Sequence, residues 1–123
     1  MMIGVINSQL EATLRLQVVG TNGQSLEVTA VIDTGYNGAL SLPRSIVAAL
    51  SLPQAAVREV TLGDTSRKVF NFYGADVLWD GQTRKVRVLC VEGAPLLGTA
   101  LLRGYQIVAD FIEGGQVMIE VIP

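Results

Sequence analysis

Alternating apolar and polar residues predict a fold built mainly from β-strands. Residues 12–19 alternate in this way, and residues 26–32 follow as a second apolar run after Gly20-Thr21-Asn22-Gly23. Alternation with a period of two is typical of a strand with one buried face. Asn-Gly favours a hairpin turn, because both positions tolerate positive φ. Further strands are expected over residues 3–6, 39–42, 57–62, 67–72, 74–79, 83–91, 105–111 and 117–122.

Two short helices are expected among these strands. Pro43 would open the first, because proline is well placed at a first helical position, and Pro53 would stop it. Three apolar residues between the two prolines fall at helical spacing: Ile46, Ala49 and Leu50. The second helix would cover residues 99–103 and end at Gly104, since glycine is common just beyond a helix C-terminus. We interpret the first helix as a packing element without chemistry.

Two further hairpins are predicted in the middle of the chain. The first would turn at residues 63–66, Gly-Asp-Thr-Ser, a small and polar tip that an ordinary surface hairpin would also have. The second would turn at Asp80-Gly81, a preferred pair for a two-residue hairpin loop. With the short strands, these turns indicate a β-rich fold.

The composition fits one domain, residues 1–123, with enough apolar residues for a core. Half of the residues are apolar, and a chain of this length buries roughly 65% of its unfolded surface. Nine basic and eleven acidic side chains give a net charge of −2 without a long run of either sign. This argues against nucleic acid as the main partner. The densest basic group, Arg84, Lys85 and Arg87, is interpreted as a solvated strand face.

Residue types that the chain lacks narrow the chemistry. It contains no histidine, which excludes Ser-His-Asp catalysis, Cys-His catalysis and histidine-ligated metal within this chain. A single cysteine, Cys90, can form neither an internal disulfide nor a zinc cluster, and it is interpreted as a small buried hydrophobe. We therefore expect no metal and no cofactor.

The apolar runs are too short for a membrane protein. None approaches the roughly 18 uninterrupted apolar residues of a membrane helix. The N-terminus, Met1 to Asn7, lacks a basic leader, and its apolar segment is too short for a signal peptide. We expect a soluble, cytoplasmic protein that does not bind membranes.

One stretch carries candidate chemistry. The apolar run over residues 26–32 ends abruptly in Asp33-Thr34-Gly35, which places a carboxylate, a small hydroxyl and a glycine at the end of a buried strand. Asp and Gly are also ordinary turn formers, so a strand end with a capping Asp33 is the alternative. In the second half of the chain, Leu96-Leu97-Gly98 follows Pro95 and opens the second expected helix.

These elements, in this order, resemble the retropepsin-like aspartic proteases, the family of retroviral proteases and their cellular relatives. The resemblance rests on the apolar strand into Asp33-Thr34-Gly35, the hairpin around residues 63–66, and Leu96-Leu97-Gly98 before a short helix. It spans most of the chain. It implies a mainly β, single-domain retropepsin-like fold: a closed β-barrel, equivalent to half of a two-lobed acid protease, with one or two short helices.

The chemistry of this family needs two carboxyl groups at one site. Like charges a few ångströms apart cannot both ionise, so the pair shares a proton. One carboxylate activates a water while its protonated partner polarises the scissile carbonyl. This chain has one Asp-Thr-Gly, and its other aspartates lack that context: Asp64, Asp76, Asp80 and Asp110. The resemblance therefore implies a homodimer in which a two-fold axis brings Asp33 of each copy together.

The resemblance also implies roles around the catalytic Asp33. The Thr34 hydroxyl would bond to the backbone of the partner chain, and Gly35 would let the backbone approach the partner and the substrate closely. Tyr36 and Asn37 would continue the loop along the floor of the substrate cleft. Family members often carry a small residue at the position of Tyr36, so this side chain would either narrow the cleft or pack outward.

Two further segments receive roles from the same resemblance. Gly63, Asp64 and Thr65 would form the tip of a flap that closes over bound peptide. Leu97 and Gly98 would lie beneath the active-site loop and support it, with Leu97 buried.

The hypothesis that follows is a homodimeric aspartic endopeptidase that hydrolyses extended peptide segments. Such a substrate would lie between the flaps and the floor, hydrogen-bonded as an added strand. An alternative is a non-catalytic dimeric peptide-binding module that keeps the protease fold. A third is an enzyme whose only substrate is its own precursor or a fused neighbour. The apolar terminal strands, 3–6 and 117–122, would pair across the dimer axis or within one chain.

Overall fold

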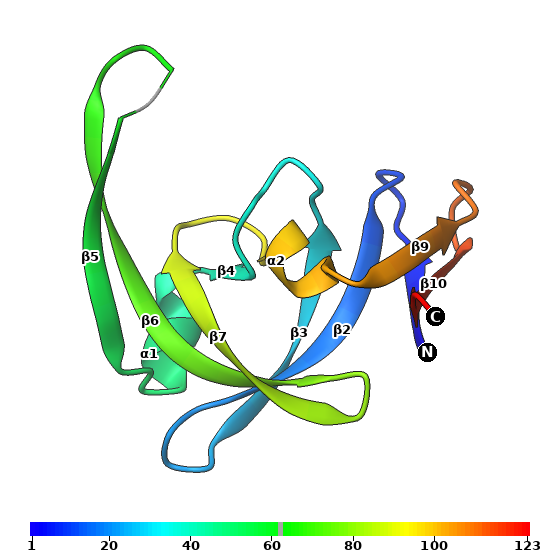
Figure 1. Ribbon diagram of the computed structural model, residues 1–123, viewed down its shortest axis with the longest axis horizontal. Helices are drawn as coiled ribbons and strands as arrows, with labels where there is room; N and C mark the ends of the chain where they lie inside the picture. Colours follow the sequence, from blue (N-terminus) through cyan, green and yellow to red (C-terminus); the bar gives the residue numbers. More distant parts are fainter. Residues whose placement is uncertain (62) are drawn as a thin grey trace.

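The computed structural model describes residues 1–61 and 63–123, and β-strands make up most of it (Figure 1). The two helices are short, α1 (Arg44–Ala49) and α2 (Thr99–Leu102). Neither helix in this part of the chain is long and apolar enough to cross a membrane. The strands in chain order are β1 (Met2–Ile6), β2 (Ala12–Val19), β3 (Ser25–Ile32), β4 (Leu40–Leu42), β5 (Gln54–Thr61), β6 (Arg67–Trp79), β7 (Gln82–Cys90), β8 (Leu96–Leu97), β9 (Tyr105–Ala109) and β10 (Gln116–Val121).

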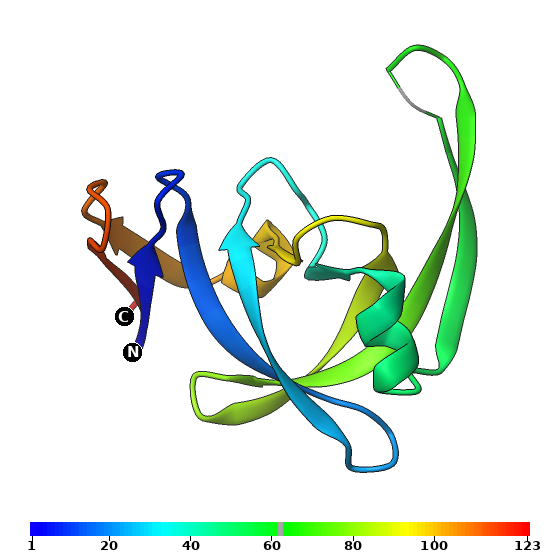
Figure 2. The ribbon, with the colours of Figure 1, turned by 180° about the vertical axis from the view of Figure 1, so that it is seen from behind.

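Six strands close into a barrel, because the last strand of the row pairs again with the first. In the order β6-β7-β4-β8-β3-β2 each strand hydrogen-bonds to the next, and the end of β2 pairs with β6, with Val18 opposite Val77. From this ring β1, β10 and β9 extend the sheet beyond β2, and β5 extends it beyond β6 (Figure 2). The mainly β fold with a closed barrel and two short helices, implied by the family resemblance, is confirmed.

The inward-facing residues form one hydrophobic core. Along β2 the expected alternation holds, since Leu14, Leu16 and Val18 are buried while Arg15 between them is exposed. Trp79 is also buried, and its ring meets the ring of Tyr105 edge-on with centroids 5.4 Å apart. An aromatic side chain removes about 150–250 Å² from water when it is buried. This pair therefore joins β9 firmly to the end of β6.

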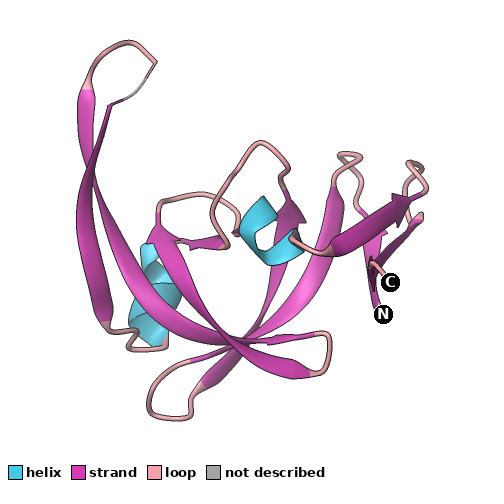
Figure 3. Cartoon of the chain, viewed as in Figure 1, coloured by secondary structure: helices cyan, strands magenta, loops and turns pink. Residues whose placement is uncertain are grey.

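β6 is one strand of 13 residues, where the sequence predicted two, over residues 67–72 and 74–79. Gly74 does not interrupt the strand, because it pairs with Arg87 of β7 and its N–H donates to the carbonyl of Pro53 at 2.9 Å. One half of β6 belongs to the barrel, and the other half rises from it with β5 as a long hairpin (Figure 3).

Other boundaries differ from the predictions by a few residues. The first strand of that hairpin begins at Gln54, earlier than expected, and its expected end, Leu62, lies outside the described residues. In α1, Pro43 is the extended N-cap rather than the first helical residue. The helix buries Val47, whereas Ala49 is exposed. Each residue advances about 100° around a helix. A small error in the predicted core-facing side of the helix therefore exchanges a buried position for an exposed one.

The two predicted tight turns differ in form. Asp80-Gly81, between β6 and β7, has positive φ at both residues, 51° and 79°, as a two-residue hairpin loop requires. Between β2 and β3 only Gly23 has positive φ, 80°, and the N–H of Gly20 donates to the carbonyl of Gln24 at 2.8 Å. Both hairpins are confirmed, but the second has a longer loop than the Asn-Gly pair indicated.

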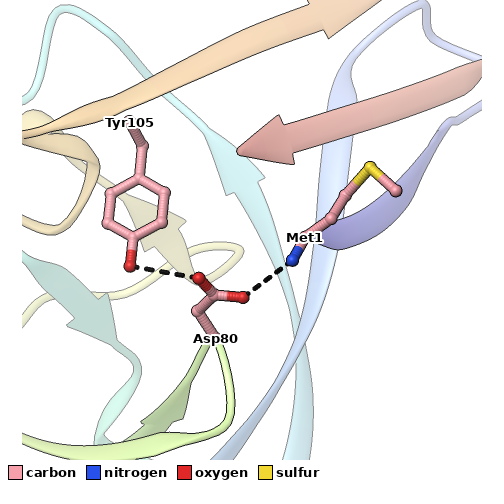
Figure 4. Close-up of polar contacts among 3 residues, drawn as sticks. All are labelled: Met1, Asp80 and Tyr105. Carbon is pink, nitrogen blue, oxygen red and sulfur yellow. Dashed lines mark hydrogen bonds and ion pairs between the residues drawn. The ribbon is translucent and has the colours of Figure 1, made fainter. Parts of the chain in front are cut away.

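The terminal strands pair within the chain. β1 lies antiparallel to β10, with Met2 opposite Ile119, and β10 pairs on its other side with β9, the edge of the sheet. Of the two pairings that the sequence left open, this chain therefore shows the one within a single copy. The same end of the sheet meets the β6–β7 turn through Asp80. The Met1 amino group lies 3.0 Å from one Asp80 carboxylate oxygen, and the Tyr105 hydroxyl donates to the other at 3.3 Å (Figure 4).

Candidate active site

The loop that follows β3, residues 33–39, begins in the middle of the sheet. β3 runs parallel to β8, with Ile32 opposite Leu97, and β8 separates β3 from β4. The chain leaving β3 therefore arches over β8 to reach β4, and Asp33 is the first residue of that arch. The N–H of Asp33 donates to the carbonyl of Leu97 at 2.9 Å, which fixes where the arch begins.

The far side of the arch is held by residues that follow β8. The N–H of Gly98 donates to the carbonyl of Ala39 at 3.0 Å. The carbonyl of Tyr36 accepts the N–H of Thr99 at 2.9 Å and its hydroxyl at 3.4 Å. Leu97, for which the resemblance implied a buried supporting position, is 0% exposed. Ala39 and Thr99 were not identified from the sequence, because backbone hydrogen bonds depend on register more than on residue type.

Asp33 is partly buried, and one of its carboxylate oxygens caps the turn. Oδ1 accepts the N–H of Gly35 at 2.9 Å, and the carbonyl of Asp33 accepts the N–H of Tyr36 at 3.1 Å. The capping role that the sequence left open is therefore present, and it uses one of the two carboxylate oxygens. Thr34 and Gly35 are exposed beside it. A Cβ on Gly35 would lie 3.2 Å from Asp33 Oδ1, so a side chain at this position would crowd the carboxylate.

Tyr36, the residue that departs from the family pattern, packs against the base of the loop. Its ring lies against Gly38 and Gly98, and its hydroxyl donates to the carbonyl of Leu40 at 3.4 Å. Burial raises the pKa of the Tyr36 phenol, because the phenolate would lose hydration. Asn37, the next residue, is exposed. Two glycines at the base of the loop therefore leave room for the large side chain.

An open recess of about 730 Å³ lies beside Asp33. One side is the end of β3, which carries Asp33 and Thr34. The other side is an apolar group formed by Leu10, Ile107 and Phe111, from the β1–β2 turn, β9 and the segment after β9. Leu10 and Phe111 are 54% and 61% exposed, so this wall faces solvent. These residues were not identified from the sequence, because no motif connects them to Asp33.

A second carboxylate also lines this recess. Glu11 stands in the turn before β2, and its Oε1 accepts Nδ2–H of Asn7 at 3.0 Å. It was not identified from the sequence, since it stands outside any recognisable motif. Within the ranges 1–61 and 63–123, no group of three or more histidine, cysteine, aspartate or glutamate side chains could hold a metal ion.

The tip of the β5–β6 hairpin is organised by its own hydrogen bonds. Asp64 Oδ1 accepts the Ser66 hydroxyl at 2.6 Å and the Ser66 N–H at 3.0 Å, and these bonds lower the pKa of Asp64. Thr65 has a φ of 67°, and Gly63 is exposed. The tip rises on the same side of the barrel as the loop after β3 but stands apart from it in both ribbon views (Figures 1 and 2). The structure therefore does not bring Gly63, Asp64 and Thr65 against Asp33.

Comparison with known proteins bears on the fold. No family model and no curated protein sequence matches the chain. Among solved structures it is similar to EIAV protease complexed with the inhibitor HBY-793, with a TM-score of 0.53 and 16% identity over 76% of this chain and 86% of that chain. It is also similar to a retropepsin-like aspartic protease from Rickettsia conorii, with a TM-score of 0.55 and 13% identity over 99% of this chain and 92% of that chain. At these identities the likeness concerns architecture, and the chain has the retropepsin-like fold.

Proposed function

We propose that this chain is an aspartic endopeptidase that hydrolyses extended peptide segments as a homodimer. The observation that carries the proposal is the placement of Asp33 at the end of β3, at the edge of an open recess, on a loop bonded to Leu97 and Thr99. A loop tied at both ends holds a carboxylate in one position, as acid–base catalysis needs. The two solved structures of similar fold are both named as proteases, one of them an aspartic protease.

One copy supplies one Asp33, so the reaction needs two copies whose Asp33 carboxyl groups face each other and share a proton. The ionised group would take a proton from a water molecule, and the water oxygen would attack the scissile carbonyl carbon. The protonated group would donate a hydrogen bond to the carbonyl oxygen. When the tetrahedral intermediate collapses, its oxyanion would re-form the C=O bond and the C–N bond would break. The amine would leave with the proton that the first carboxylate took from the water, which restores a dyad with one proton. The bond from the Gly35 N–H to Oδ1 would orient each carboxylate for these steps.

Exposed apolar residues at the terminal strands support a dimer. Exposed apolar side chains that gather at one end of a chain are typical of a protein-interaction surface, and within residues 1–61 and 63–123 β9 is an outer strand of the sheet, open to a further strand. Phe111 belongs to this group and also lines the recess beside Asp33, so a two-fold contact here would bring the two recesses together. Six large apolar side chains of this end are 47–68% exposed: Ile3, Val5, Val108, Phe111, Ile112 and Val121.

The β5–β6 hairpin is the candidate flap. It rises from the barrel on the side of the Asp33 loop (Figure 1), and Val57 and Val69 are 56% and 60% exposed although they lie on paired strands. A peptide between the hairpin and the loop after β3 would cover apolar surface of this kind. Its backbone would hydrogen-bond as an added strand.

A cleavage assay with a denatured, unbiased peptide mixture tests the proposal. We expect hydrolysis at acidic to mildly acidic pH, because the dyad needs one protonated carboxyl group. Asp33→Asn should keep the fold and the dimer and lose hydrolysis. Asp110→Asn is the matched control, since Asp110 lacks the Thr-Gly context, and it should stay active. Full hydrolysis by repurified Asp33→Asn, or activity that keeps rising above neutral pH, would contradict the dyad.

The alternative, a peptide-binding module that keeps the fold, is favoured by one specific contact. The bond from the Gly35 N–H to Asp33 Oδ1 gives Asp33 a structural role in the turn without any chemistry. If a preparation shown to be dimeric cleaves no peptide at any pH, and Asp33→Asn lowers its stability, the module becomes the better description.

A further inference from the structure

A second recess, here called the basic recess, lies beside the loop that follows Asp33. It measures about 330 Å³ and is lined on one side by Tyr36 and Gly38 of that loop. The opposite side is formed by Phe72 of β6 and by residues 84–87 of β7. Three of its lining residues are basic, and no lining residue in the described part of the chain is acidic. From the sequence this basic group was interpreted as a solvated strand face, and in the fold the group also borders the candidate active-site loop.

Two of the three cations are held in place by contacts inside the protein. Arg84 Nη1 donates to the carbonyl of Leu101 at 3.2 Å, which ties this side chain to α2. The guanidinium of Arg87 lies 5.9 Å from the centre of the Phe72 ring, a cation–π contact. A guanidinium held against a ring loses less conformational entropy when it binds a ligand than a freely rotating one.

The cross-strand neighbours of these cations differ. Lys85 lies opposite Asp76 of β6, so a carboxylate stands near its charge. Arg87 lies opposite Gly74, which has no side chain. Arg84 lies opposite Val77, which is also uncharged, but Arg84 is only partly exposed and already bonds to Leu101. Arg87 is therefore the exposed member of the group that has no charge opposite it.

The basic recess is bounded by the two elements between which the proposed substrate would lie. Tyr36 and Gly38 belong to the loop that starts at Asp33, and Phe72 belongs to β6, the strand that continues into the hairpin. Gly38 is at the far end of the loop, next to β4. An extended peptide advances about 3.3 Å per residue. If its scissile bond lies at Asp33, a substrate side chain near Gly38 therefore belongs to a residue some positions away from that bond.

We propose that the basic recess binds an acidic side chain, Asp or Glu, of the peptide substrate and so directs cleavage to sites some residues away from a carboxylate. This inference rests on the proposed peptidase function and adds a substrate class to it. Arg87 would hold the carboxylate through paired, charge-assisted hydrogen bonds. Lys85 would add positive charge, and the ring of Phe72 would pack against the methylene groups of the bound side chain.

Matched peptides test the proposal by cleavage. A peptide cleaved from the unbiased mixture is resynthesised with each Asp or Glu changed in turn to Asn or Gln, and with an amidated C-terminus. We expect kcat/KM to fall about three- to tenfold for a change at one position away from the scissile bond, and to fall less at high salt. Arg87→Gln should remove this preference. Arg103→Gln, which removes an exposed cation outside the recess, should keep it.

Binding to an inactive variant makes the test independent of catalysis. Two pools of amidated, fluorescein-labelled dodecapeptides, identical except for Glu in one pool and Gln in the other, are titrated into Asp33→Asn and into Asp33→Asn/Arg87→Gln. Stronger binding of the Glu pool by the first protein, with equal binding by the second, supports the basic recess even if the wild type cleaves nothing. In that case the peptidase proposal fails, whereas the proposed binding of acidic side chains by the basic recess stands.

Three results would overturn the basic recess. One is equal binding of both pools by Asp33→Asn. Another is cleavage without a charge preference, which would leave the peptidase proposal standing. The third is a preference that appears only when the peptides carry a free C-terminus, because the recognised carboxylate would then be terminal and not a side chain.

Discussion

The ring of Tyr36 occupies the space into which a side chain at Gly98 would point, with Cδ2 of the ring 2.7 Å from that Cβ position. The same position would lie 2.6 Å from the Tyr36 carbonyl oxygen, and it also meets the carbonyl oxygen of Gly38. A large residue in the active-site loop is thus matched by a glycine at the start of α2. The active-site loop therefore packs closely against the start of α2, although Tyr36 stands where family members often carry a small residue.

Gly98→Ala should lower the free energy of unfolding by about 1–3 kcal/mol, as overpacking does in a dense interior. The added methyl group meets backbone carbonyl oxygens as well as the ring, so the substitution should stay destabilising in combination with Tyr36→Ala. Gly74→Ala is the control, because its Cβ would meet Pro53 at an ordinary 4.0 Å. Urea unfolding followed by the fluorescence of Trp79, the single tryptophan, measures both variants. Equal stability of Gly98→Ala and Gly74→Ala would contradict the close packing.

Tyr36→Phe should make the protein less sensitive to alkaline pH. Burial raises the pKa of the phenol above its ordinary value of 10.0, so the folded state keeps this proton to higher pH than the unfolded state does. The resulting stabilisation is complete below pH 10.0 and is lost as the pH rises through the folded-state pKa. The urea midpoint should decrease more between a pH below 10.0 and a pH above it for the wild type than for Tyr36→Phe. Equal decreases of the urea midpoint in the two proteins would show that Tyr36 does not contribute to the alkaline loss of stability.

Thr34→Val should weaken the proposed dimer, whereas Thr34→Ser should preserve it. Thr34 is exposed in the single chain, and in the dimer its hydroxyl would bond to the backbone of the partner. Valine would leave that backbone group unpaired at a buried site, at about 1–3 kcal/mol. About 1.4 kcal/mol corresponds to a tenfold rise in the dissociation constant. Sedimentation velocity over a dilution series measures this constant, and equal values for the valine and serine variants would place the hydroxyl outside the interface.

Val108→Lys should yield a folded monomer without activity on the peptide mixture. Val108 lies on the edge strand β9 and is 49% exposed, so lysine should be tolerated by the single chain but not within an apolar dimer contact. Leu26→Lys is the matched control, since Leu26 is 39% exposed on β3, whose neighbours in the sheet are β2 and β8. It should remain dimeric. A Val108→Lys protein that is still a dimer would show that the two copies meet elsewhere.

Local signals predicted the elements well, and long-range pairing explains the errors. The alternation along residues 12–19 and the Asp80-Gly81 turn depend on neighbouring residues alone, and both were predicted correctly. Residues 67–72 and 74–79 were predicted as two strands, but they form one, because pairing with β7 continues through Tyr73 and Gly74. Closure of the barrel depends on the pairing of Val18 with Val77, which a periodic pattern does not encode.

The residues of the candidate site also fall into those that a local motif identifies and those that only the folded chain brings together. The motif residues Asp33 and Leu97 were identified because the family pattern contains them, and the fold places them at the two ends of one hydrogen bond. The apolar wall formed by Leu10 and Phe111 was missed, since it is assembled from two turns far apart in the sequence. The orientation of Tyr36 was left open, because it depends on glycines that become its neighbours only in the folded chain.

The position of β8 between β3 and β4 bears on how the protein is made. Asp33 is synthesised before the carbonyl of Leu97 and the N–H of Thr99, which hold its loop. A nascent chain that has emerged only as far as β7 lacks a member of the barrel ring, so it can complete neither the barrel nor the loop. Contacts between residues so distant in sequence also form slowly. Until β8 and Thr99 have emerged, the growing chain therefore carries an aspartate without an assembled site, and the proposed peptidase cannot form before its own sheet can close.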